Sequence, residues 1–339
     1  MSKDLKISVL IPTLNRCESL KNCLDSLIKQ TYKNFEVVVV DGGSTDGTKE
    51  LLNQYYNKLS IKFAVQKGGL IPQENKGWKI ATGDIIVRTD DDVIASPQWL
   101  QGIADTFNLS EKIGGVTGPT IIPEERKEYR DLFYFEKKLE NGNIFWRLIG
   151  KIYFDYFLEG EPFAVSKWFR SGAFSLGSNY PECLKLKEPF EVTHQEACNM
   201  ATRKDLLERI GGFDETFIGI GEFNEPDVSF KIKNLGYKIF FNPKAVVYHL
   251  PSKEGFFKDR PNSYGRVLNF INFYFRHIKP NTLDKFMRFS TYLIFLNAFW
   301  TYKFLTTMQI NQLSCIPGTI VGLAKNMFNK NKHARKYHG

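Results

Sequence analysis

Apolar runs alternate with segments of helical spacing along the first hundred residues. The runs are rich in valine and isoleucine and predict strands, whereas leucines three or four residues apart predict amphipathic helices. Apolar strands that alternate with helices are typical of a parallel sheet covered on both faces, so an α/β fold is expected. The predicted strands are 6–12, 35–40, 61–65 and 84–89, and the predicted helices are 16–30, 45–56 and 75–81.

The pattern changes in the second half of the chain. Residues 124–170 are rich first in charge and then in aromatic side chains, which we interpret as helical elements over the sheet. Regular patterning then returns and predicts further elements. These are a segment at 197–203, helices at 204–210 and 227–235, and a pair of strands at 238–241 and 245–249.

Polar residues gather where predicted strands end, which is the edge at which parallel sheets bind ligands. Three adjacent carboxylates at residues 90–92 repel one another, and Mg²⁺ or Mn²⁺ would relieve that repulsion. Because side chains alternate along an extended chain, Asp90 and Asp92 share one side and Asp91 takes the other. A solvated turn or a helix cap is the alternative for this cluster. The groups that follow the strands are Pro12-Thr13, Asp41-Gly42-Gly43 and Asp90-Asp91-Asp92.

Other polar residues allow a chemical and a structural interpretation. Asp41 can accept a hydrogen bond from the imide N–H of uracil or thymine, or can belong to an ordinary loop before a helix. Within Gly221–Asp227, one carboxylate can serve as general base for a hydroxyl, or can favour a helix N-terminus. His249 ends an apolar strand and is either a metal or phosphate ligand or a structural histidine.

The net charge of +9 belongs to the last quarter of the chain. Residues 255–339 hold 13 Lys and Arg against 2 Asp and Glu, whereas the other 254 residues hold 33 against 35. The five cysteines are scattered and form no CxxC, so neither a disulfide framework nor a cysteine zinc site is supported. The short apolar run at the start does not fit a secretory signal, and a cytosolic chain is expected.

The basic region is also apolar. Residues 289–324 carry one charge, Lys303, but polar residues and a Pro317-Gly318 break argue against a membrane span. We expect interfacial helices that contact an anionic membrane surface through residues 286–339. Two alternatives stay open: short or re-entrant membrane helices, and a helical subdomain packed on the rest of the chain with a solvated basic tail.

Taken together, these segments resemble the family 2 inverting glycosyltransferases, which have the GT-A fold. The resemblance covers most of residues 5–250, in order and at matching spacing. Each of the five matching segments alone is weak evidence for the family, but the five together make the resemblance specific. The matching segments are ISVLIPTLNR (7–16), FEVVVVDGGSTDGT (35–48), ENKGWKIATGDIIVRTDDDV (74–93), NMATRKDLLERIGGFDETF (199–217) and NEPDVSFKIKNLGYKIFFNPKAVVYH (224–249).

The resemblance implies roles for individual residues. Glu225 stands at the position of the family's catalytic base. Glu222 and Asp227 are alternatives, because the family's Glu-Asp pair is not clearly matched in this sequence. Asp41 would read the pyrimidine, and His249 would complete a metal site made by a DxD-type motif at Asp90 and Asp92, which binds Mn²⁺ or Mg²⁺. Glu74 stands where the family commonly has arginine, so one cationic contact with the donor is missing. The implied nucleotide-sugar contacts are Pro12, Thr13, Asn15, Asp41, Gly43, Asn75, Asp90 and Asp91.

The implied activity is transfer of a sugar from a nucleotide diphosphate sugar, UDP- or dTDP-linked, with inversion. The acceptor would be a hydroxyl of a saccharide or lipid-linked molecule, in cell-surface polysaccharide or glycoprotein glycan synthesis. Residues 1–254 would form the catalytic domain, with a nucleotide-sugar half (1–122) and an acceptor half (123–254), and residues 255–339 a helical membrane-associating extension. The enzyme would be peripheral or monotopic on the inner face of the cell membrane.

Three other functions are weighed against this one. A nucleotidyltransferase acting on a sugar phosphate would need an early glycine-rich loop for a triphosphate, and Leu14-Asn15-Arg16 offers none. A nucleic-acid-binding protein lacks a recognised signature here, and the apolar tail fits lipid better, so no nucleic-acid partner is expected. A catalytically inactive nucleotide-binding homologue is disfavoured by the intact Asp90, Asp92, Glu225 and His249.

Overall fold

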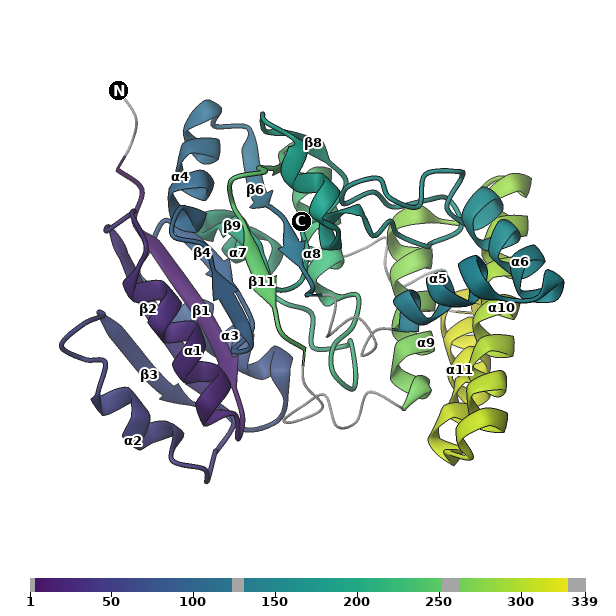
Figure 1. Ribbon diagram of the computed structural model, residues 1–339, viewed down its shortest axis with the longest axis horizontal. Helices are drawn as coiled ribbons and strands as arrows, with labels where there is room; N and C mark the ends of the chain where they lie inside the picture. The colour runs from purple at the N-terminus through teal and green to yellow at the C-terminus, as the bar shows by residue number, and fades with distance from the viewer. Residues whose placement is uncertain (1–3, 124–130, 252–261, 329–339) are drawn as a thin grey trace.

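A computed structural model of the chain describes residues 4–123, 131–251 and 262–328. Its centre is an eight-stranded sheet with the strand order β3-β2-β1-β4-β9-β6-β10-β8 (Figure 1). The pairs β3/β2, β2/β1, β1/β4 and β6/β10 are parallel, whereas β9 and β8 pair antiparallel with their neighbours. The strands are β1 (Ile7–Thr13), β2 (Phe35–Asp41), β3 (Ile61–Val65), β4 (Ile85–Arg88), β6 (Ile113–Thr117), β8 (Phe190–Val192), β9 (Met200–Arg203) and β10 (Lys238–Phe241).

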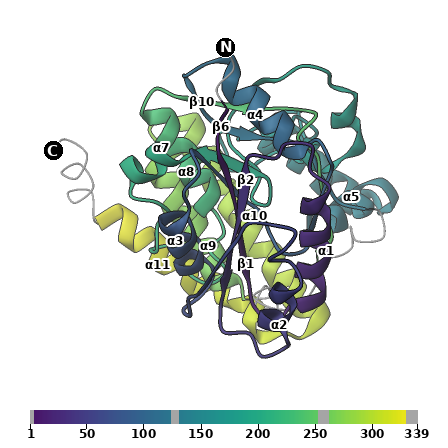
Figure 2. The same cartoon turned by 90° about the vertical axis from the view of Figure 1, so that its left-hand side faces the viewer.

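Helices cover both faces of this sheet because its strands are apolar on both sides. Val9 of β1 packs in one core with α1, α2 and α4, and Leu10 packs in a second core with α3, α7 and α8. Figure 2 shows α3, α7 and α8 on one side of β1 and β2, with α1 on the other. The helices are α1 (Cys17–Ile28), α2 (Thr48–Asn53), α3 (Leu70–Ile80), α4 (Trp99–Leu109), α7 (Lys204–Ile210) and α8 (Asn224–Asn234).

A helical region adjoins the sheet at the right of Figure 1. Its aromatic side chains share one core that joins the region around residues 146–173 to the C-terminal helices. Phe223 and Ile278 contact both this core and the sheet's second core, so the helices are packed onto the α/β layers. The helices are α5 (Asp131–Asn141), α6 (Ile144–Lys151), α9 (Ser263–Phe273), α10 (Leu283–Thr307) and α11 (Cys315–Phe328), with π-helical turns at Ile152–Phe157 and Tyr274–Ile278.

Most predicted elements of the α/β part agree with the structure to within a few residues. Helices α3 and α8 begin earlier than predicted, at Leu70 and Asn224. The predicted pairing of strands 238–241 and 245–249 is wrong. β10 belongs to the large sheet, whereas β11 (Val247–His249) joins β5 (Val93–Ala95) and β7 (Thr120–Ile121) in a separate three-stranded sheet. The basic tail at 329–339 and the first residues of the predicted 124–170 helices lie outside the described residues.

Asn242 explains why the two strands diverge. Its side-chain amide donates hydrogen bonds to the Gly102 carbonyl oxygen at 2.9 Å and to Thr106 Oγ1 at 2.7 Å, both in α4. Its side-chain oxygen accepts from the backbone N–H of Lys244 at 2.8 Å. The chain is therefore turned and held at α4 directly after β10, and it continues into the small sheet that carries His249.

Gly118 marks the closest approach between β6 and the segment that leads into β11. A Cβ atom at this position would lie 2.1 Å from the backbone oxygen of Ala245. We expect Gly118→Ala to destabilise the fold by about 1–3 kcal/mol, since a backbone atom must move to make room. Urea unfolding monitored by circular dichroism measures this loss.

Gly265→Ala is the matched control for this prediction. A Cβ atom there would lie 3.4 Å from Ile218, an ordinary contact, inside helix α9. Because alanine favours a helix over glycine by up to about 1 kcal/mol, this variant should be as stable as the parent or more so. Equal midpoints for the two variants would contradict the close approach at Gly118.

Candidate active site

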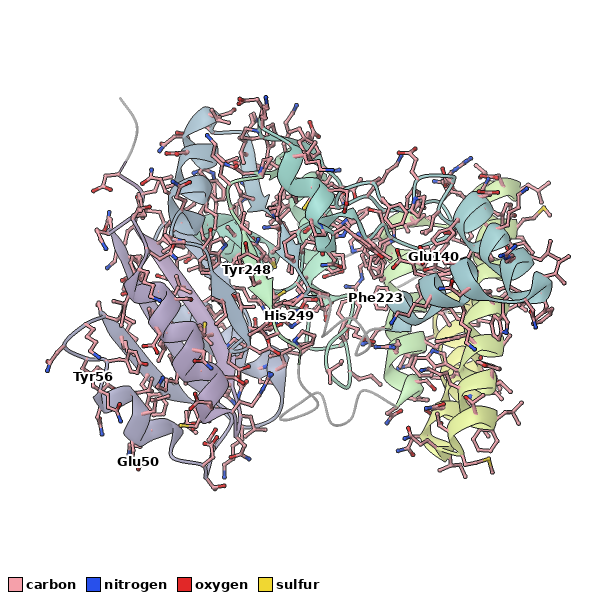
Figure 3. All side chains as sticks on the ribbon, in the orientation of Figure 1. Glu50, Tyr56, Glu140, Phe223, Tyr248 and His249 are labelled. Atoms are coloured by element: carbon pink, nitrogen blue, oxygen red, sulfur yellow. The ribbon has the colours of Figure 1, made fainter. Side chains whose placement is uncertain are left out.

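The carboxyl ends of β1, β2 and β4 bring together the polar residues that the sequence analysis singled out. Thr13 and Asp41 are the paired last residues of β1 and β2, and Asp90 to Asp92 follow β4 after one residue, Thr89. His249 reaches the same place from the small sheet, where it pairs with Val93 (Figure 3). These residues are all buried.

The three adjacent aspartates have overlapping sets of partners. Asp91 accepts a hydrogen bond from Thr13 Oγ1 at 2.7 Å and pairs with Arg16 at 2.7 Å. Asp92 pairs with Arg16 at 2.6 Å and with His249 Nε2 at 3.2 Å. Asp90 pairs with Arg88 at 2.8 Å. Asp91 and Asp92 lie in a turn and share Arg16, so the predicted alternation of an extended chain does not apply to them. Asp90 and Asp92 nevertheless both lie near His249.

Burial and pairing act in opposite directions on the pKa values of these groups. Burial raises the pKa of Asp91 to about 7, although Arg16 opposes the shift. Burial also raises the pKa of Asp92, but the pairs with His249 and Arg16 outweigh it and hold that pKa well below its usual range. For His249, burial lowers the pKa, but Cys198 and Asp92 outweigh burial and raise it to about 10.

Arg88 links this cluster to the candidate base. Its guanidinium pairs with Glu74 at 2.7 Å and approaches Glu225 at 3.7 Å, in addition to its contact with Asp90. Burial raises the pKa of Glu74 to about 7 and also raises that of Glu225, with Arg88 opposing both shifts. Glu74 stands where the family commonly has arginine. In the structure its charge is paired with that of Arg88 at the end of β4.

The three candidate bases have different surroundings. Glu222 forms an ion pair with Arg266 of α9. Asp227 is fully buried and pairs with Lys231 at 2.7 Å, with Arg276 at 2.6 Å and with His277 at 2.7 Å, which keeps its pKa low despite burial. Glu225 is the one of the three that lies beside the Arg88–Asp90 pair.

Other predicted donor contacts lie in loops around the cluster. The Asp41 carboxylate accepts from the backbone N–H of Ser44 at 3.0 Å and from its hydroxyl at 2.6 Å, so it closes its own loop. Asn15 joins that loop by accepting from Thr45 N–H at 2.8 Å. Gly43 has a φ of +99° in the same loop, and Pro12 is buried inside β1.

Asn75 lies apart from the carboxylates. Its amide donates to the Phe213 carbonyl at 2.9 Å and to Glu215 at 3.0 Å, and its oxygen accepts from the indole of Trp78 at 3.0 Å. These bonds fasten α3 to the loop that follows α7. The structure therefore assigns Asn75 a scaffolding role in addition to any contact with a donor.

Sequence reasoning missed three residues of this site: Arg16, Arg88 and Cys198. Arg88 could have been noticed as the one cation in the apolar segment that leads into the aspartates. Arg16 directly follows the first strand's polar end, and Cys198 precedes a matching segment, but neither position shows its partners. These partners lie 70 to 80 residues away for Arg16 and 51 for the Cys198–His249 pair.

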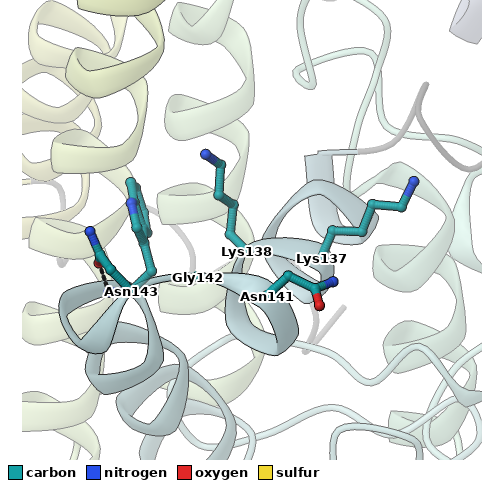
Figure 4. Close-up of a pocket in the computed structure, with 6 residues that line it drawn as sticks. Lys137, Lys138, Asn141, Gly142 and Asn143 are labelled. Carbon is teal, nitrogen blue, oxygen red and sulfur yellow. Dashed lines mark hydrogen bonds between the residues drawn. The ribbon is translucent and has the colours of Figure 1, made fainter.

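The donor set fits a divalent cation. Asp90, Cys198 and His249 each offer a ligand atom, and these atoms all lie within 4.8 Å of one another. Carboxylate, thiolate and imidazole are the groups by which proteins hold divalent transition metals. A surface hollow elsewhere lies between α5 and α6 and is lined by Lys137, Lys138 and Trp146 (Figure 4); it is separate from this cluster.

Comparison with known proteins agrees with this fold. Residues 8–169 match the family model described as Glycosyl transferase family 2. Over 107 residues, the chain is 37% identical to the glycosyltransferase AglE of Haloferax volcanii, covering 30% of this chain and 35% of that protein. It is 33% identical over 139 residues to the glycosyltransferase GlyG of Streptococcus pneumoniae, covering 35% of this chain and 46% of that protein. The chain therefore spans less than half of either relative.

Solved structures resemble the chain over nearly its whole length. S. aureus TarS 1-349, solved in complex with UDP-GlcNAc, has a TM-score of 0.58 at 18% identity and covers 95% of this chain and 81% of that one. The mannosyltransferase PcManGT from Pyrobaculum calidifontis, solved with GDP-Man and Mn²⁺, has a TM-score of 0.53 at 17% identity, with coverages of 96% and 88%. The fold is thus that of GT-A glycosyltransferases.

Proposed function

We propose that this protein is a metal-dependent, inverting glycosyltransferase. It moves a sugar from a UDP- or dTDP-linked donor to a hydroxyl of a saccharide or lipid-linked acceptor, in the synthesis of cell-surface polysaccharide or glycoprotein glycans. The observation that carries the proposal is the meeting of Asp90, Asp92 and His249 beside Glu225 at the carboxyl edge of the sheet. Neighbours crystallised with UDP-GlcNAc, or with GDP-Man and Mn²⁺, support the donor class and the use of a metal.

The reaction is a single in-line displacement. Glu225 takes the proton of the acceptor hydroxyl, whose oxygen attacks the anomeric carbon from the face opposite the leaving nucleoside diphosphate. Because burial raises the pKa of Glu225, this carboxylate accepts a proton more readily than an exposed glutamate. Asp90, Asp92 and His249 would hold a divalent cation, whose positive charge would offset the charge developing on the diphosphate. One displacement inverts the anomeric configuration.

A thermal-shift panel tests donor binding. Nucleoside diphosphates and nucleotide sugars are added to the protein with and without Mn²⁺, and the same panel is run on Asp92→Asn. We expect one nucleotide class to raise the melting temperature only when Mn²⁺ is present. At a nucleotide concentration of a hundred times Kd, the free energy of unfolding should rise by about 2.7 kcal/mol. Asp92→Asn should lose this ligand-induced rise.

Asp105→Asn is the matched control, because Asp105 is exposed on α4 and contacts only Gln101 among the hydrogen bonds described. It should retain the full nucleotide response. The metal-dependent proposal is contradicted if folded Asp92→Asn responds as strongly as the parent. A rise with guanine nucleotides in place of uracil or thymine nucleotides would correct the donor and leave the reaction class intact.

We further propose that residues 286–339 hold the enzyme at an anionic membrane surface. Support comes from large apolar side chains that are more than half exposed on α6 and along the C-terminal helices, with Ile144 at 87% and Ile294 at 68%. Exposed cations accompany them, including Arg147 and Lys151 on α6. Apolar burial and attraction to anionic headgroups together hold interfacial helices. Across the described ranges, no helix combines the length and the hydropathy that crossing a bilayer requires.

Vesicle sedimentation tests this location. We expect the protein to bind vesicles of phosphatidylcholine with phosphatidylglycerol more tightly than pure phosphatidylcholine, and high salt to weaken the binding. Ile294→Asp should reduce the partition coefficient by at least about tenfold, since it removes an apolar contact and adds a repelled charge. Leu109→Asp, at an equally exposed apolar position on α4, should not. Equal binding by both variants would reject the C-terminal surface as the contact.

A further inference from the structure

Cys198 is held rigidly at the edge of the carboxylate cluster. Its carbonyl oxygen accepts a hydrogen bond from Thr89 Oγ1 at 2.9 Å, and the carbonyl of Ala197 accepts from Arg88 at 2.7 Å. On the other side, Asn199 donates to the Ala245 carbonyl at 2.8 Å. The backbone on both sides of the thiol is therefore fastened to the end of β4 and to the segment that leads into β11.

This placement brings the thiol to two predicted metal ligands. The ligand atoms of Asp90, Cys198 and His249 come from three separate parts of the chain, and all three residues are buried. Among the described residues, they form the one such group of three. Ligand atoms that bind one ion at about 2.0–2.3 Å lie within about 4 Å of one another. The three atoms here lie within 4.8 Å of one another, which is close to that spacing.

The chemistry of the set differs from that of an all-oxygen site. Mg²⁺ and Mn²⁺ favour carboxylate, carbonyl and water oxygens, whereas thiolate and imidazole favour Zn²⁺ and Co²⁺. A cysteine ligand binds as thiolate, so metal binding releases the thiol proton to solvent. A thiol in this position therefore strengthens the preference of the site for Zn²⁺ and Co²⁺ over Mn²⁺ and Mg²⁺.

Cys23 shows that not every thiol near the cluster has this geometry. Its sulfur contacts the backbone oxygen of Asp90 at 3.8 Å, and it packs in the apolar core with α1. Burial raises the pKa of this thiol well above its usual range, with Asp91 adding to the shift. Cys23 offers a buried thiol beside the same aspartates but outside the ligand set.

We propose that Cys198 is a ligand of the divalent cation at this site, together with Asp90 and His249, and that it increases the preference of the site for Zn²⁺ and Co²⁺ over Mn²⁺ and Mg²⁺. The proposal rests on the proposed function, in which Asp90 and His249 hold a metal. Zn²⁺ accordingly displaces Mn²⁺ from the enzyme at equal concentrations.

Cobalt absorption spectroscopy on the full-length, metal-free protein tests the proposal directly. Addition of Co²⁺ should produce the near-ultraviolet absorption of a cobalt–thiolate bond in the parent and in Cys23→Ala. Cys198→Ser should lose that absorption. In calorimetric titrations, Cys198→Ser should bind Zn²⁺ more weakly by a factor on the order of 10 to 100, while its affinity for Mn²⁺ changes little.

A competition on the unmodified protein keeps the test independent of variant folding. Electron paramagnetic resonance of free Mn²⁺ should show its release when an equal concentration of Zn²⁺ is added. If Co²⁺ binds without thiolate absorption, or Mn²⁺ resists Zn²⁺, Cys198 is no ligand and the metal site of the proposed function still stands. If neither Co²⁺ nor Mn²⁺ binds the folded protein, the metal site itself fails.

Discussion

Replacing Glu225 with Gln should lower kcat for sugar transfer by about 10²- to 10⁴-fold, the range over which general bases contribute. The amide has nearly the same shape but cannot take the acceptor proton. Donor binding should persist, because Asp90, Asp92 and His249 are unchanged. The measurement is steady-state transfer with the donor that the thermal-shift panel identifies, together with the KM for that donor.

Glu222→Gln is the control that separates the base from its neighbour. The Glu222 carboxylate is paired with Arg266 of α9, so its loss should reduce activity only a few-fold. Asp227 is less suitable as a control, because three cationic or titratable side chains depend on it and its replacement would disturb the fold. If Glu222→Gln lost as much activity as Glu225→Gln, the assignment of the base would be wrong.

Replacing Arg88 with Met should destabilise the protein by about 3–5 kcal/mol, the usual penalty for removing one partner of a buried charge network. Within the part of the chain that the structure describes, Arg88 is the cation that contacts Glu74, Asp90 and Glu225 together. Methionine fills similar space but leaves these carboxylates without their common partner. Urea unfolding followed by circular dichroism gives the free energy of unfolding.

Two further variants give this prediction its controls. Adding Glu74→Gln to Arg88→Met should recover part of the lost stability, since it removes one of the repelling carboxylates. Lys238→Met breaks the ion pair with Glu191, in which both side chains are about half exposed, and should change stability by less than about 1 kcal/mol. Similar losses for Arg88→Met and Lys238→Met would mean that the Arg88 network contributes no more than a surface pair.

The C-terminal helices contribute to the site as well as to the proposed membrane surface. Arg266 on α9 pairs with Glu222, and Arg276 and His277 from the following π-helical turn pair with Asp227. These contacts hold both ends of the short stretch that carries Glu225. Removal of residues 255–339 should therefore disturb the stretch that carries Glu225, so point variants on the exposed surface are better tests of membrane binding than truncation.

Local patterns of the chain were enough to predict the α/β architecture and the edge of the sheet that carries the site. Strand and helix periodicities depend on residues two to four positions apart, so the strand predicted at 35–40 and the helix predicted at 16–30 agree with β2 and α1 to within two residues. The position of Asp41 and of residues 90–92 directly after strands followed from the same patterns. The combined motifs also predicted a resemblance to family 2 glycosyltransferases, and residues 8–169 match the model of that family.

Long-range pairing was decided only by the tertiary structure. Arg88 meets Glu74 and Glu225, and Cys198 meets His249, because distant segments are packed against the end of β4. The separation of β10 from β11 likewise depends on hydrogen bonds from Asn242 to α4, 136 to 140 residues away in sequence. Such contacts leave no periodic trace in the sequence, since they depend on how whole elements pack. The sequence by itself therefore determined the elements and the edge of the sheet at which the polar residues gather, whereas packing determined which charges and candidate ligands meet.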